Sequence, residues 1–158
     1  MPATIRIWLE LAHHAAFRVG GWAFVRVDAA GQVSGTAAGE RRLDPGRAAL
    51  LALRAALQGL PPGVPAELST ASAAVLAIPR RLAAAEAGQD PPGEDLDLWA
   101  QAATALRSGQ VALRRAEPAP GSPAVFAAAW AELARDRAKD KGAFSAAIPK
   151  PNLAKAGV

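Results

Sequence analysis

The chain has 158 residues, 51% of them hydrophobic and 20% charged, which suits one globular domain with a buried core and excludes a wholly disordered chain. It has no cysteine, which excludes disulfides, thiolate nucleophiles and cysteine-ligated zinc or iron–sulfur centres. The formal net charge is +4, but all four lysines follow residue 138, where only Asp140 opposes them, so the basic character is concentrated at the C-terminal end.

The first forty residues predict a three-stranded antiparallel meander. Residues 5–11 alternate apolar with polar side chains and are rich in β-branched and aromatic types, which indicates a strand, and residues 22–27 indicate a second. Residues 28–31 have the composition of a turn that leads into a weaker strand at 32–38. His13 and His14 fall in the loop that we predict between the first two strands.

From Asp44 onward the pattern predicts helices alternating with strands. Asp44 is a candidate N-cap with Pro45 at the first helical position, and leucines then recur at helical spacing up to Leu60. Ser72 is a second candidate N-cap, for a helix that Pro79 should kink or divide. The remaining predicted elements are strands at 67–70 and 110–116 and helices at 73–87, 95–107 and 124–137.

This order of elements predicts an α/β fold: a mixed five-stranded sheet, made of the three-stranded antiparallel meander plus two parallel strands, flanked by helices. We assign residues 1–137 to this domain. Residues 138–158 show no sustained periodicity and carry Pro149 and Pro151, so we predict a basic C-terminal tail or arm.

The hydropathy of the chain shows no run of about 18 apolar residues, so we expect no membrane span. The N-terminus lacks a basic region followed by an apolar run and a cleavage site. We therefore expect a soluble, cytoplasmic protein.

Several short motifs occur in a specific order and spacing. Gly20-Gly21-Trp22 begins ten residues after Glu10, and Asp97-Leu98-Trp99 opens a predicted helix. Between them lie Arg47-Ala48-Ala49-Leu50-Leu51-Ala52-Leu53 and Thr70-Ala71-Ser72, and Leu133-Ala134 falls in the last predicted helix. In these motifs residues 4–137 resemble the type 1 ribonuclease H family.

The resemblance implies the fold of that family but not its chemistry. Active members hold two magnesium ions with four carboxylates and use them to cleave the phosphodiester bond. The matching positions here are Glu10, Ala49, Ala71 and Ala131, and alanine offers no oxygen ligand. We therefore expect no catalytic residue, no bound metal and no other cofactor, and a catalytically inactive protein.

A residual metal-dependent nuclease remains a minor alternative. Glu67, Glu132 or Asp136 could approach the site and replace the missing carboxylates.

Two functions remain open at this point. The first is a nucleic-acid-binding module for an RNA/DNA hybrid or an RNA duplex, in which cationic side chains contact phosphates. Its candidate residues are Arg41, Arg42, Arg47, Arg114, Arg115, Lys139 and Lys141. The second is a protein-interaction or regulatory module, in which Phe144, Ile148 and Leu153 of the C-terminal arm dock into a protein partner.

Overall fold

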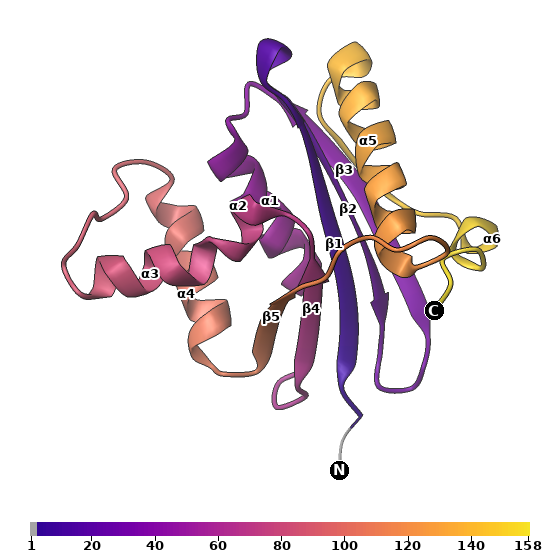
Figure 1. Cartoon of the computed structure of the whole chain (residues 1–158), viewed down its shortest axis with the longest axis horizontal. Coiled ribbons are helices and arrows are strands. Elements are labelled where there is room, and N and C mark those ends of the chain that lie inside the picture. The colour runs from indigo at the N-terminus through magenta and orange to yellow at the C-terminus, as the bar shows by residue number, and fades with distance from the viewer. Residues whose placement is uncertain (1–2) are drawn as a thin grey trace.

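In the computed structural model, which describes residues 3–158, six strands form one mixed sheet in the order β5-β4-β1-β2-β3-β6 (Figure 1). The helices α1 to α4 lie on one side of this sheet, and α5 covers the other (Figure 1). The strands are β1 (Ile5–His14), β2 (Val19–Val27), β3 (Val33–Arg41), β4 (Ala66–Thr70), β5 (Val111–Arg115) and β6 (Phe144–Ala147).

The predicted meander is confirmed. β1 pairs antiparallel with β2, and β2 pairs antiparallel with β3. In the β2–β3 turn the Asp28 carboxylate accepts hydrogen bonds from the amides of Ala30 and Gln32, and Gly31 adopts a φ of 85°, which favours glycine. β4 runs parallel to β1, and β5 runs parallel to β4, as the fold class requires.

The helices begin where the sequence offers capping side chains. The Asp44, Ser72 and Ser122 side chains each accept a hydrogen bond from a first-turn amide of the helix that follows. The predicted helix over 73–87 is divided just before Pro79, as expected. The helices are α1 (Pro45–Leu57), α2 (Ala73–Leu76), α3 (Ile78–Glu86), α4 (Leu96–Arg107), α5 (Pro123–Lys141) and α6 (Lys150–Leu153), with a single 3-10 turn, η1 (Ala15–Phe17).

The core fills both faces of the sheet. On one face Ile5, Ile7 and Leu9 of β1 pack under the leucines of α1. On the other face alanines of α5 pack against small residues of β2 and β3, and this close approach requires glycine: a Cβ on Gly21 would lie 2.2 Å from the Arg135 amide nitrogen. The alanine-rich composition thus places α5 directly on the sheet.

The prediction for the C-terminal end is wrong in two respects. The helix predicted to end at residue 137 continues to Lys141, so the proposed boundary at 137/138 falls inside α5. The following segment is not a separate tail, because β6 pairs antiparallel with β3 as a sixth strand, where we predicted five. Ile148 and Leu153 are buried and Phe144 packs against the same cluster, so this arm wraps onto its own domain.

One smaller correction concerns the first two strands. His13 and His14 end β1 and do not lie in a loop, since β1 and β2 extend further than the alternation of side chains indicates. Among residues 3–158, no helix is both long enough and apolar enough to cross a membrane.

Candidate functional site

Glu10 is the buried carboxyl group of the sheet. It lies on β1 and points toward α5, and its side chain is held at the end of the neighbouring strand β4. The Thr70 hydroxyl donates to one carboxyl oxygen over 3.3 Å, and the Ala71 amide donates to both over 3.0 and 3.2 Å. Parallel pairing of β1 with β4 produces this arrangement, because the register places Trp8 beside Ser69 and hence Glu10 beside Ala71.

Burial sets the ionisation of Glu10. Loss of hydration raises its pKa from 4.5 to about 7, against the hydrogen bonds from Ala71 and Thr70, which favour the charged form. The negative charge of Glu117 is a smaller contribution to the same rise in pKa. At neutral pH the group is therefore close to half protonated and could exchange a proton with a molecule beside it.

Glu10 lines a cavity of about 370 Å³ between the ends of β1 and β4 and helix α5. Helix α5 contributes Ala128, Glu132 and Arg135, which share one face of the helix because they are spaced by four and three residues. His13 and Ser72 also line this cavity. The Arg135 guanidinium bonds to Asp136 over 3.2 Å.

The three alanines at positions that match carboxylates of the ribonuclease H family have different surroundings. Ala71 adjoins Glu10 through its amide. Ala49 is buried in the core between α1 and the sheet, and Ala131 is buried between α5 and the sheet, where its carbonyl oxygen lies against Gly21. Neither Ala49 nor Ala131 lines the cavity around Glu10.

The residues of this site do not fit two magnesium ions. Within residues 3–158, no three His, Cys, Asp or Glu side chains gather to hold a metal ion. Of the three shifted carboxylates considered above, Glu132 lines the cavity, whereas Glu67 pairs with Arg114 and Asp136 with Arg135. One buried and one exposed carboxylate supply too few oxygens for that centre.

Of the seven cationic side chains predicted from the sequence, three form ion pairs within the domain. Arg47 bonds to Asp95 over 2.5 Å, Arg115 bonds to Glu117 over 3.1 Å, and Arg114 bonds to Glu67. The Asp95 carboxylate raises the pKa of Arg47. Arg114 and Arg115 lie on the edge strand β5, at the far side of the sheet from β3.

Of the other four, Lys139 contacts Phe17 and Arg41 bonds to the end of α5, and Arg42 and Lys141 are close to these two in sequence. The Lys139 ammonium lies 3.9 Å from the centroid of the Phe17 ring, and that ring is 56% exposed. The Arg41 guanidinium donates to the carbonyls of Ala138 and Lys139 over 2.7 to 3.1 Å, which anchors the end of β3 to the end of α5.

We call this set the Phe17 cluster; its members are Phe17, Arg18, Arg41, Arg42, Lys139 and Lys141. The sequence analysis missed Phe17 and Arg18. The signal for this cluster in the sequence was an aromatic residue next to an arginine, in a stretch without helical or strand periodicity.

The comparisons with known proteins bear on the fold. No protein-family model and no curated protein sequence matches this chain. Among solved structures it is similar to LC9-RNase H1, a type 1 RNase H with the type 2 active-site motif, at 15% identity over 96% of this chain and 80% of that one, with a TM-score of 0.59. The chain has the ribonuclease H-like fold.

Two further structures with this fold are similar to the chain. LC11-RNase H1, solved in complex with an RNA/DNA hybrid, is 16% identical over 85% of this chain and 99% of that one, with a TM-score of 0.62. The N-terminal RNase H domain of rv2228c from Mycobacterium tuberculosis, solved as a fusion with maltose-binding protein, is 17% identical over 87% and 97%, with a TM-score of 0.54. The fold class predicted from the sequence is confirmed, with β6 as the added strand.

Proposed function

We propose that this chain is a non-catalytic ribonuclease H-like module that binds an RNA/DNA hybrid or an RNA duplex. The observation that carries the proposal is the Phe17 cluster, in which Lys139 lies over an exposed aromatic ring and Arg41 bonds to the Lys139 carbonyl, and no carboxylate within residues 3–158 pairs with either cation. Phosphates are bound by such cations independently of base sequence, and an exposed ring offers a surface on which a base can stack.

The charge of the cluster is available to a ligand. Arg41 bonds to carbonyl oxygens, which are uncharged, so it keeps its full positive charge. Arg18, Arg42 and Lys141 are exposed and, within the described part of the chain, no carboxylate pairs with them. The five cations of the cluster outnumber Glu40, Asp44 and Asp140, the carboxylates within two residues of them in sequence.

The cluster is continuous with the cavity around Glu10. Lys139 lies four residues after Arg135 and seven after Glu132, on the face of α5 that lines the cavity. A duplex backbone that contacts the cluster would therefore pass the position where active ribonucleases H cleave. The similarity to LC11-RNase H1, solved with an RNA/DNA hybrid, supports this choice of ligand.

We propose no cleavage by this chain, because the site lacks the carboxylate oxygens that would bind a pair of magnesium ions. Glu10 already accepts hydrogen bonds from Thr70 and Ala71, and burial keeps it partly protonated at neutral pH. A half-neutral carboxyl group is a poor ligand for a divalent cation.

The test is fluorescence anisotropy with a labelled RNA/DNA hybrid and the full chain at several salt concentrations. We expect affinity to fall as salt rises, and Lys139→Gln to lower the slope of log K against log salt by about 1, since one phosphate contact is lost. Arg80→Gln is the matched control, because Arg80 is exposed on α3 and lies outside the cluster. Absence of binding at low salt, or equal effects of both variants, would refute the proposal.

A protein-interaction module remains the second candidate, on one observation. An apolar cavity of about 250 Å³ lies between α5 and β6, lined in part by Trp130, Leu133 and Phe144, and Leu133 is 60% exposed. This cavity adjoins the edge of the sheet, where β6 is the last strand. Ile148 and Leu153, which we expected to dock into a partner, are buried in this domain instead.

A further inference from the structure

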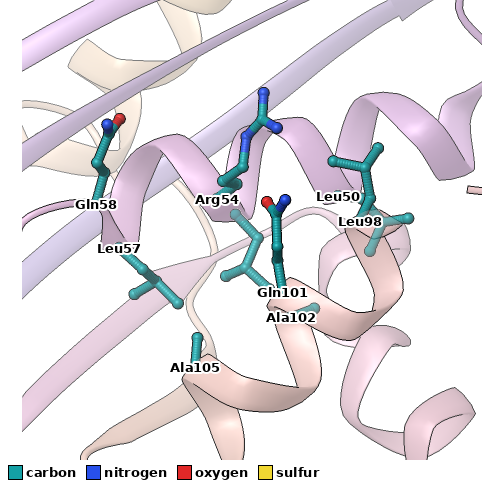
Figure 2. A pocket seen from close by; sticks show the side chains of 9 residues that line it. Leu50, Arg54, Leu57, Gln58, Leu98, Gln101, Ala102 and Ala105 are labelled. Atoms are coloured by element: carbon teal, nitrogen blue, oxygen red, sulfur yellow. The ribbon is translucent and has the colours of Figure 1, made fainter. Parts of the chain in front are cut away.

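A groove of about 460 Å³ runs between α1 and α4, on the side of the sheet opposite α5. Figure 2 shows Leu50 beside Leu98 at one end of the groove, and Leu57 with Ala105 at the other. The two helices therefore run along it in the same direction. The apolar residues that line it are Leu50, Leu53, Leu57, Leu98, Ala102 and Ala105.

The groove exists because the α4 side is built from small residues. Leucines of α1 form one wall, whereas Ala102 and Ala105 of α4 end at Cβ and leave the space between the helices unfilled. Leu50, Leu53 and Leu98 are at most 3% exposed, so they form a dry floor rather than a surface patch. The volume falls within the range of about 300–1,000 Å³ that is typical of small-molecule sites.

The rim of the groove is polar, and its charge is positive. Within residues 3–158, Arg54 is the one charged side chain that lines it, and no carboxylate of that range pairs with Arg54. The amides of Gln58 and Gln101 are also on the rim. In Figure 2 the polar ends of Arg54 and Gln101 point to the same side, away from the apolar floor.

We propose that the α1–α4 groove binds a small organic anion with an unbranched apolar body, such as a medium-chain carboxylate. The apolar body would lie along the leucines, and the carboxylate would accept hydrogen bonds from Arg54 and the rim amides. This site is separate from the Phe17 cluster and does not depend on nucleic-acid binding.

The length of the groove and the positive charge of Arg54 on its rim suit this occupant. Leu50 and Leu57 are seven residues apart on α1, which corresponds to about 10 Å along the helix axis. An extended chain of about eight carbons has that length, given C–C bonds of about 1.5 Å.

The test is calorimetric titration of the full chain with octanoate, octanol and octyltrimethylammonium. We expect octanoate to bind most tightly, and Ala105→Leu to weaken it about tenfold or more, because the added side chain fills the groove. Ala100→Leu is the matched control, since Ala100 is exposed on the same helix and does not line the groove. Thermal melts establish that both variants fold.

The charge is tested separately with Arg54→Gln. We expect octanoate to bind about threefold more weakly to this variant and octanol to bind unchanged, since an exposed cation contributes modestly. Arg80→Gln, on α3 and away from the groove, should leave both ligands unaffected. The proposal is overturned if octanoate does not bind, if octanol binds equally well, if Ala105→Leu binds octanoate like the unchanged chain, or if an amphipathic helical peptide binds where octanoate does not.

Discussion

The buried carboxyl group of Glu10 makes the stability of this domain depend on pH in an unusual direction. Its pKa is about 7 in the folded chain, compared with an ordinary value of 4.5 that we take for the unfolded chain. The folded state therefore binds the proton more tightly. The stability that this protonation contributes is fully present below about pH 4.5 and is lost as the pH rises to about 7. The difference between the two pKa values corresponds to about 3 kcal/mol.

Glu10→Gln removes this dependence while keeping an acceptor for the Ala71 amide. We expect the variant to match the unchanged chain near pH 4.5 and to exceed it by up to about 3 kcal/mol in free energy of unfolding at pH 8. Urea denaturation of both proteins at pH 4.5, 6, 7 and 8 measures the difference in free energy of unfolding. The contributions of all other titrating groups cancel in this difference.

Glu132→Gln is the matched control, because Glu132 lines the same cavity but is exposed. Its stability should differ from that of the unchanged chain by a constant amount across this pH range. Parallel curves for the unchanged chain and Glu10→Gln would show that Glu10 titrates normally, and would refute the reasoning from burial.

Two further substitutions test the packing of the domain. Gly21→Ala places a Cβ 2.2 Å from the Arg135 amide nitrogen and should force α5 away from the sheet, at a cost of about 3 kcal/mol in thermal or urea denaturation. Gly46→Ala, where the Cβ would meet its nearest atom at 3.7 Å, should be neutral or stabilising; equal losses for both would contradict the close approach of α5. Ile148→Ala should cost about 3 kcal/mol because Ile148 is buried where the C-terminal arm packs on its own domain, whereas exposed Leu133→Ala should change stability by less than about 0.5 kcal/mol. A negligible effect of Ile148→Ala would instead indicate a detached tail.

Much of the fold was predictable because its signals are local. Asp44 and Ser72 provide N-caps, and the leucines of α1 recur at helical spacing, so helix starts and faces follow from a few neighbouring residues. β6 was missed because its four residues show no alternation long enough to identify. Its pairing with β3 brings together residues about a hundred positions apart, which no local pattern encodes.

The candidate site was predictable only in part. The resemblance assigned Glu10, Ala49, Ala71 and Ala131 to one site. The structure joins Glu10 and Ala71 by a hydrogen bond, whereas Ala49 and Ala131 do not line the cavity around Glu10. The Phe17 cluster was not predicted as a unit, because Phe17 and Lys139 meet through the packing of α5 on the sheet. Ion pairs between distant residues also could not be predicted from the sequence, because no residue near Arg47 indicates that Asp95 lies beside it.

We propose that this chain binds a hybrid duplex without cleaving it. The most direct measurement incubates the full chain with a labelled RNA/DNA hybrid and magnesium, and follows anisotropy against salt and strand length by gel in the same samples. We expect binding that weakens as salt rises and a hybrid that stays intact. Magnesium-dependent cleavage that Glu10→Gln abolishes, or no binding at low salt, would contradict it.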